Sequence, residues 1–207
     1  MKVIKNCPSG FASNSYVLFD ELSGQAAVID PSISWQTALK GFGSDLPQVK
    51  YILLTHGHFD HMLCLAEWRE RFGAAVCIHK EDAPCLTDPK KSYFLKFAGK
   101  NTTFDPPDVN ISEGEVFYLG DNKITVMHTP GHTRGSVCYI AGDYFFSGDT
   151  LLCGDIGRCD LYGGDFQEMQ NSLAKISNLT RNYTIYPGHG ENTTLKAELK
   201  YNRYFCL

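Results

Sequence analysis

The chain has 207 residues, of which 43% are hydrophobic and 20% are charged, and its formal net charge is −4. This composition excludes disordered and fibrous proteins and favours one domain spanning residues 1–207. The longest apolar run, residues 74–78, is far shorter than the ~18 residues that cross a membrane as a helix. Lys2 and Lys5 precede polar residues instead of an apolar stretch, so we expect no secretory signal, no membrane partner and a cytoplasmic location.

The distribution of charge indicates which partners to expect, and the spacing of the cysteines indicates whether they form disulfides. The charges are scattered, without a basic stripe or an acidic tail, so we expect a small-molecule substrate and no nucleic acid. The cysteines are irregularly spaced and form no C-x-x-C pair, which indicates reduced thiols and no disulfide framework. They are Cys7, Cys64, Cys77, Cys85, Cys138, Cys153, Cys159 and Cys206. The oligomeric state is left open.

In the first half of the chain, runs rich in β-branched residues alternate with helical periods. We expect strands at residues 2–5, 15–19 and 25–30, a weak helix near 34–42, a strand at 49–54, a helix after Asp60, a strand at 75–78 and a weak helix near 80–86. The helix after Asp60 has an apolar stripe at His61, Leu65, Trp68 and Phe72, and Gly73 is typical of its end. Residues 87–110 are rich in proline and aromatic residues, and we interpret them as an irregular lid-like excursion.

The second half continues the alternation. We expect strands at residues 116–119, 123–128, 136–140 and 143–147, a helix after Asp165, a strand at 183–186 and a weak helix near 193–203. Asp165 and Glu168 have the spacing of a helix-capping pair. The alternation of strands and helices predicts an α/β or α+β fold.

The apolar run Tyr51-Ile-Leu-Leu54, which has the character of a buried strand, leads into a group of metal-binding residue types. These are His56, His58, Asp60 and His61. The spacing H-x-H-x-D-H arises by chance about once in two thousand chains of this composition, and such a polar cluster is costly without a cation. The motif therefore predicts a metal site. An aspartate before a helix is also an ordinary cap, so Asp60 has two compatible interpretations.

Three further candidates follow other strands in the same way. His132 lies in T-P-G-H-T, Asp149 in S-G-D-T and His189 in Y-P-G-H-G, each just past the end of an expected strand. The carboxyl ends of strands are where open α/β sheets bind ligands. Five imidazoles and two carboxylates exceed the ligands of one tetrahedral zinc but suit two divalent ions with open positions, of which Zn, Fe and Mn all accept nitrogen and oxygen donors. Such a centre favours hydrolysis.

These residues resemble the metallo-β-lactamase superfamily, through T-H-x-H-x-D-H at residues 55–61 together with the three later ligand candidates. The resemblance covers nearly the whole chain and implies a four-layer αββα sandwich of two mixed sheets. It also implies that one metal ion, most often zinc, is held by His56, His58 and His132, and a second by Asp60, His61 and His189. Asp149 would bridge the two ions, and an attacking hydroxide would lie between them.

Within this superfamily, the motifs around residues 129–133, 147–150, 156–160 and 163–165 look like those of the short glyoxalase II-like thioester hydrolases. The resemblance implies a thioester or small-ester hydrolase acting on a substrate like S-lactoylglutathione, with Asp60 passing a proton to the leaving group. Only 18 residues follow His189, so the helical domain that binds glutathione in glyoxalase II is not expected. Asp149 stands where β-lactamases of the main zinc group carry cysteine, so the resemblance does not imply antibiotic hydrolysis. A mononuclear-iron persulfide dioxygenase shares part of this ligand set and a lactonase shares all of it, so both remain alternatives.

Other polar residues have two interpretations each. Asp30, at the end of the expected strand 25–30, either orients a ligand histidine or caps the turn. Arg158 either receives a substrate carboxylate or pairs locally with Asp160. Cys153 is expected to be a packed, inert thiol. The two remaining histidines, His79 and His128, are expected to pack beside strands.

Overall fold

The computed structural model describes residues 1–205, and within them two mixed sheets of six strands face each other. The first sheet contains, in order, β1 (Lys2–Asn6), β2 (Ser15–Asp20), β3 (Gln25–Ile29), β4 (Gln48–Leu53), β5 (Ala75–His79) and β6 (Val109–Ile111). Strands β1 to β3 pair antiparallel, and β3 to β6 pair parallel.

The second sheet is built from the later part of the chain. Its order is β12 (Thr193–Thr194), β11 (Thr184–Pro187), β10 (Tyr144–Gly148), β9 (Val137–Ala141), β8 (Asn122–His128) and β7 (Val116–Leu119). Only the β10–β11 pair is parallel among the pairs of this described sheet.

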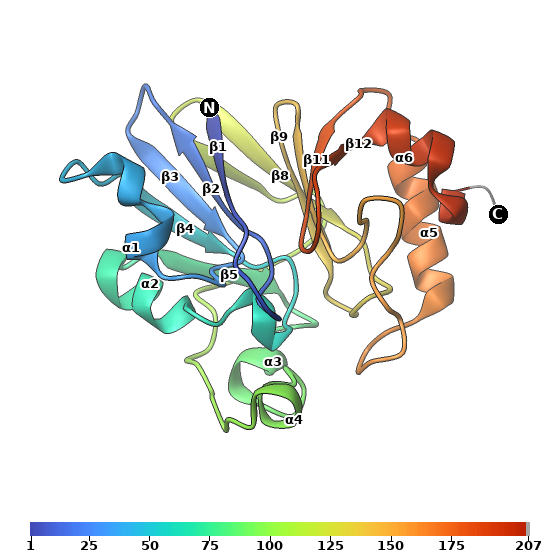
Figure 1. The fold of residues 1–207 in the computed structure, drawn as a ribbon, viewed down its shortest axis with the longest axis horizontal. Helices are drawn as coiled ribbons and strands as arrows, with labels where there is room; N and C mark the ends of the chain where they lie inside the picture. The colour runs from blue at the N-terminus through green and yellow to red at the C-terminus, as the bar shows by residue number, and fades with distance from the viewer. Residues whose placement is uncertain (206–207) are drawn as a thin grey trace.

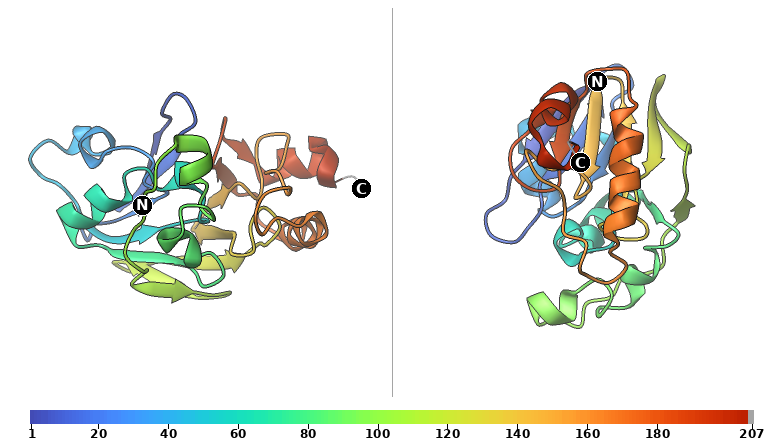
Figure 2. Two further views of the ribbon diagram at one scale, coloured as in Figure 1. Left: turned by 90° about the horizontal axis from the view of Figure 1, so that it is seen from below. Right: turned by 90° about the vertical axis from the view of Figure 1, so that its right-hand side faces the viewer.

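Helices cover the outer faces of both sheets. Figure 1 shows α1 (Trp35–Ala38) and α2 (Leu65–Phe72) on one side, and α5 (Phe166–Ser177) and α6 (Leu195–Tyr201) on the other. The views in Figure 2 show the same layers, with α3 (Pro84–Thr87) and α4 (Phe94–Ala98) at one end of the sheets. Short 3-10 helices lie at Lys40–Phe42, Phe59–His61 and Arg203–Phe205. The expected four-layer αββα sandwich is confirmed.

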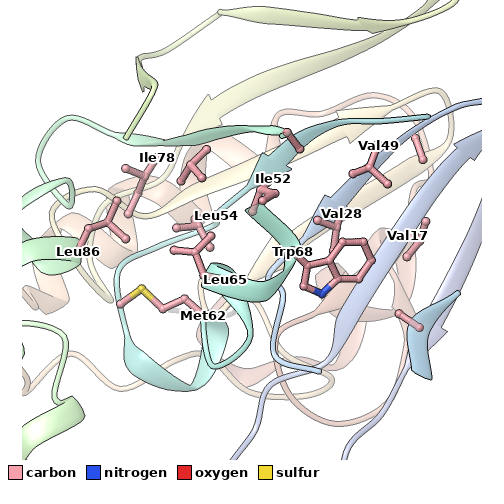
Figure 3. Close-up of a cluster of buried hydrophobic side chains, with 14 of the residues drawn as sticks. Val17, Val28, Val49, Ile52, Leu54, Met62, Leu65, Trp68, Ile78 and Leu86 are labelled. Atoms are coloured by element: carbon pink, nitrogen blue, oxygen red, sulfur yellow. The ribbon is translucent and has the colours of Figure 1, made fainter. Parts of the chain in front are cut away.

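Three hydrophobic clusters hold the four layers together. Along β2, Tyr16 and Leu18 point between the sheets while Val17 points toward the helices, as the two-residue period of a strand requires. The helix-side cluster of the first sheet surrounds the fully buried Trp68, which packs with side chains such as Ile52 (Figure 3). A third cluster lies between the second sheet and α5 and α6. Strands covered on both faces read as nearly continuous apolar runs, which is why they were predictable.

Several expected elements differ in detail. The helix after Asp60 is interrupted: a 3-10 turn carries Asp60 and His61, and α2 begins only at Leu65. Asp60 is therefore not its cap, and the alternative interpretation of this residue is wrong. The segment 87–110, expected to be irregular, contains α4 and the beginning of β6, and the short β12 was not expected. Gly73 does end α2 in a left-handed conformation, and Asp165 does cap α5 by accepting a bond from the Glu168 amide.

Two further expectations concern membranes and thiols. No helix within residues 1–205 is long and apolar enough to span a bilayer. Seven of the cysteines are free thiols, and Cys206 lies outside the described residues. Cys153, expected to be packed, is exposed because it lies in a tight turn where Leu152 pairs with Asp155.

Candidate metal centre

The strand registers bring the predicted site residues to one edge of the sandwich. Ile29 pairs with Leu53, so Asp30 and the residues after β4 leave the first sheet side by side. In the second sheet Gly148 pairs with Pro187, which places Asp149 beside the loop that carries His189. Residues from both sheets therefore converge, although Asp30 and His189 lie about 160 positions apart in the chain.

The first group consists of three buried histidines. His56 Nε2 lies 3.1 Å from His58 Nδ1, which lies 2.9 Å from His132 Nε2. Two nitrogens that share one tetrahedral zinc at ~2.0 Å stand ~3.3 Å apart, so this spacing fits a shared cation. The other ring nitrogen of His132 faces the carbonyl oxygen of Arg158 at 2.7 Å, which orients the ring.

The second group consists of Asp60, His61 and His189. His189 Nε2 lies 3.1 Å from Asp60 Oδ2, and His61 Nε2 lies 3.8 Å from the same oxygen. Asp149 stands between the two groups, with its carboxylate 3.5 Å from His61, 3.6 Å from His132 and 3.6 Å from His189. All seven predicted ligand residues are thus brought together, in overlapping sets that can each hold a metal ion.

Unpartnered polar atoms show that these residues fit a cation. His61 Nε2 and Asp149 Oδ1 are buried, face each other at 3.5 Å and have no hydrogen-bond partner among residues 1–205. Leaving buried donors and acceptors unsatisfied costs about 1–3 kcal/mol each, so such groups need an explanation. Nitrogen and carboxylate donors without thiolate suit Zn, Fe or Mn.

The electrostatics of the two groups differ. Burial and the neighbouring histidines lower the pKa of His56 well below its usual range and that of His58 to about 3, so both rings are neutral at pH 7 and offer lone pairs. Burial opposes charge on His61, but the carboxylates of Asp30, Asp149 and Asp60 raise its pKa well above the usual value. Burial likewise opposes charge on Asp149, and the surrounding histidines nevertheless hold its pKa well below the usual range. The second group therefore combines anionic carboxylates with a protonated ring whose proton a metal ion would replace.

Asp30 adopts the orienting role that was one of its two interpretations. Its Oδ2 lies 2.8 Å from His61 Nδ1 and accepts a 2.7 Å bond from the Thr55 hydroxyl, and its Oδ1 accepts a 2.8 Å bond from the Thr55 amide. Asp30 itself adopts a left-handed backbone conformation (φ 51°), which is uncommon outside glycine. This carboxylate fixes which nitrogen of His61 faces the site.

Two residues that support the site were missed by the sequence analysis. Asn14 holds the loop that carries His189. Its backbone N–H donates to Gly188 O at 2.6 Å, and its side-chain Nδ2 donates to Pro187 O and Gly190 O at 2.9 and 3.0 Å. Asp82, in the turn after β5, accepts bonds from the loops that carry His58 and His132. Neither residue belongs to a motif. Asn14 donates to backbone carbonyl oxygens and Asp82 accepts from backbone amides and a hydroxyl, and such bonds leave no signal in the sequence.

A pocket of about 460 Å³ opens onto the donor cluster. Apolar side chains make up much of its wall: Phe11, Phe59, Tyr93, Phe97, Leu152, Ile156 and Leu161. Arg158 also lines the pocket, and its guanidinium pairs with both oxygens of Asp160 at 2.6 and 2.7 Å, so the local pair foreseen for it exists. The excursion 87–110 reaches the pocket through Tyr93 and Phe97.

Comparison with known proteins agrees with this geometry. The family model of the metallo-beta-lactamase superfamily matches residues 8–189, so the chain belongs to this superfamily. An uncharacterized protein of Mycobacterium leprae is 35% identical over 98% of both chains, and the hydroxyacylglutathione hydrolase GloC of Haemophilus influenzae is 29% identical over 95% of this chain and 94% of its own.

Two solved structures are similar over most of their length. The B3 metallo-beta-lactamase BLEG-1 superposes with a TM-score of 0.91 and 30% identity over 99% of both chains. ETHE1 from Myxococcus xanthus superposes with a TM-score of 0.80 and 26% identity over 99% of this chain and 88% of its own. Superfamily membership and the histidine–aspartate cluster together indicate a metal-dependent hydrolase that uses divalent ions.

Proposed function

We propose that the protein is a binuclear hydrolase that cleaves a thioester or a related small ester. The observation that carries the proposal is the convergence of seven nitrogen and oxygen donors, some of them buried and unpartnered, at an apolar pocket. A structural zinc needs about four ligands and no pocket, whereas two catalytic ions keep open positions for substrate and water.

The donor sets divide between two positions. His56, His58 and His132 would hold one ion, Asp60, His61 and His189 the other, and Asp149 lies within reach of both sets. Zinc is our first choice, and iron or manganese suits the same donors. Two divalent ions bound there would supply a hydroxide at neutral pH and polarise the scissile carbonyl.

The chain's own residues bind the substrate and handle its protons. The apolar wall of the pocket receives the acyl group and excludes water from it. Asp60 lines the same pocket, where its carboxylate can take up the proton that the attacking hydroxide loses and pass it to the leaving thiolate. Arg158 stands at the pocket with an exposed guanidinium, where it can bind a carboxylate of the thiol part in exchange for Asp160.

The similarity to known proteins supports a thioester hydrolase and also identifies the competing activities. GloC is named a hydroxyacylglutathione hydrolase, which is a thioesterase activity. BLEG-1 is named a B3 metallo-beta-lactamase, so hydrolysis of a β-lactam is a competing activity. The similarity to ETHE1 keeps an iron-dependent persulfide dioxygenase in view, and a lactonase would use the same donors.

The test combines elemental analysis with a substrate panel on one preparation. The panel contains S-lactoylglutathione and other acyl thioesters, a lactone, a β-lactam, and glutathione persulfide with oxygen consumption recorded. About two ions per chain with thioester turnover support the proposal. One iron per chain with oxygen-dependent persulfide turnover, or turnover of the lactone or β-lactam alone, overturns it. Asp149→Ala should abolish turnover, and full activity of this variant would contradict the assigned site.

A further inference from the structure

Asp82 is a buried carboxylate that no step of the proposed reaction uses. It lies between β5 and α3 and is 3% exposed. It accepts three hydrogen bonds: its Oδ2 from the Gly57 amide at 2.9 Å and from the Thr133 hydroxyl at 2.7 Å, and its Oδ1 from the Gly135 amide at 2.8 Å. An ionised carboxylate offers only acceptors, which matches three donors.

All three donors belong to the loops that carry the three-histidine group. Gly57 lies between His56 and His58, and Thr133 directly follows His132. One carboxylate thus joins two loops that are about 75 positions apart in the chain. The joint is tightly packed: a Cβ at Gly135 would lie 2.6 Å from Asp82 Cγ, and a Cβ at Gly57 would overlap Cys85.

The other donor group is held by different residues. Asp30 contacts His61 directly, and Asn14 bonds the loop of His189. Within residues 1–205, Asp82 makes no hydrogen bond to Asp60, His61 or His189. Asp82 therefore bonds only loops of the three-histidine group. Asp30 contacts His61 directly and also bonds Thr55, whose hydroxyl lies 3.2 Å from His56 Nδ1.

We propose that Asp82 is the positioning residue of the three-histidine metal position, as Asp30 is of the position that contains His61. The inference rests on the proposed function in assuming that both groups hold metal ions. In Asp82→Asn, the amide NH₂ would face at least one of the N–H or O–H donors, so one loop would move away from the other. Loss of such an outer partner costs about 10–100-fold in metal affinity.

The experiment measures zinc binding by metal-stripped protein, by titration against a chromophoric chelator, without any substrate. Asp82→Asn is made in two backgrounds that each retain one position. In His189→Ala, which keeps the three-histidine group, Asp82→Asn should weaken the remaining zinc about 10–100-fold. In His58→Ala, which keeps the Asp60–His61–His189 group, Asp82→Asn should change zinc affinity less than about threefold. In this background Asp30→Asn should instead weaken zinc about 10–100-fold.

Glu198 provides a matched control. It is also a carboxylate that is 3% exposed and accepts three bonds, from the Gly154 amide, the Thr193 hydroxyl and Asn202 Nδ2, but it belongs to α6 and bonds no loop that carries a candidate ligand. Glu198→Gln should lower thermal stability while leaving both zinc affinities unchanged. If Asp82→Asn fails to fold, Thr133→Val removes one donor only and should weaken the three-histidine position by a few-fold.

The outcomes separate the two proposals. If Asp82→Asn weakens both positions equally, or no more than Glu198→Gln does, Asp82 is a structural residue and this inference is wrong while the binuclear hydrolase stands. If the unmodified protein binds no zinc, iron or manganese, the proposed function fails and the inference fails with it.

Discussion

Gly188 precedes His189, and its α-carbon faces the carboxylate of Asp149. A Cβ at this position would overlap Asp149 Oδ1 and lie 2.7 Å from His61 Cε1. We expect Gly188→Ala to displace both side chains and to reduce zinc affinity and turnover by at least about fivefold, since overpacking typically costs about 1–3 kcal/mol. Zinc titration and steady-state kinetics check this.

The control for this substitution is Gly41→Ala. Gly41 lies in an exposed 3-10 turn, where a Cβ would meet nothing within 4 Å. The Gly41→Ala substitution should leave zinc affinity and turnover unchanged. Equal behaviour of the two variants would show that the close approach at Gly188 does not shape the site.

The side chains that form the donor cluster were predictable from the sequence, but the residues that hold their loops in place were not. The spacing from His56 to His61 and the turns around His132, Asp149 and His189 identify residue types that the structure does bring together. Asp82 and Asn14 act on backbone amides and carbonyls, and any residue supplies those groups. Their role depends on which loops meet in space, so only the structure reveals it.

The ends of β5 and β8 contain two stacked histidines. The rings of His79 and His128 lie 4.0 Å apart and are nearly parallel, at 10°, and His79 is 3% exposed. Burial, the adjacent His128 and Lys80 lower the pKa of His79 to about 4, below its unfolded value of ~6.5. The folded state thus disfavours the proton, so the stability is complete above pH 6.5 and is lost as the pH falls toward 4.

We therefore expect His79→Phe, which keeps an aromatic ring but cannot titrate, to flatten this pH dependence. The linkage amounts to as much as about 2 kcal/mol at pH 5 relative to pH 7.5. Urea denaturation of metal-stripped protein at the two pH values measures it, because metal release at low pH is then absent. Parallel changes in wild type and variant would show that His79 does not titrate in this window.

The segment 87–110 meets the loop 158–165 at Tyr93. The Tyr162 amide donates a 2.7 Å bond to Tyr93 Oη, and the Tyr93 ring lies edge-on to His58 with centroids 5.5 Å apart. We expect Tyr93→Phe to speed amide exchange of Tyr162 by about fivefold, because a hydrogen bond contributes ~1 kcal/mol. Hydrogen-exchange mass spectrometry on the peptide 158–165 measures it.

Tyr118→Phe is the matched change for this prediction. Tyr118 is 52% exposed on β7 and does not line the pocket. The Tyr118→Phe substitution should leave amide hydrogen exchange in residues 158–165 unchanged. Unaltered exchange in Tyr93→Phe as well would mean that the two segments are not joined by this bond, and the lid-like role foreseen for residues 87–110 would lose its support.

Element predictions succeeded where burial determines the pattern. Strands such as β3 and β4 are covered on both faces, so their apolar runs are unambiguous. The helix after Asp60 starts later than expected. A 3-10 turn places Asp60 and His61 at the donor cluster and replaces the first turn of the expected helix. Tertiary contacts likewise order α4 and β6, whose sequences lack a clear period.

The whole molecule places half of the candidate site on each sheet. The segment after β4 supplies His56, His58, Asp60 and His61, and loops of the second sheet supply His132, Asp149 and His189. Without a cation, the unpartnered donors at this edge disfavour close approach of the two sheets. Bound ions would therefore act as a cross-link between the sheets as well as a catalytic centre.

Removal of metal should consequently destabilise the fold as a whole. A ligand present at 1,000 times its Kd stabilises the folded state by about 4 kcal/mol, and each kcal/mol corresponds to about 2–4 °C for a chain of this size. We expect EDTA followed by gel filtration to lower Tm by about 8–16 °C, and added zinc to restore it. Asp149→Ala, which removes the carboxylate between the two groups, should show a much smaller difference between stripped and loaded protein. If stripping leaves Tm of the unmodified protein unchanged, the donors do not join the sheets through a tightly held ion.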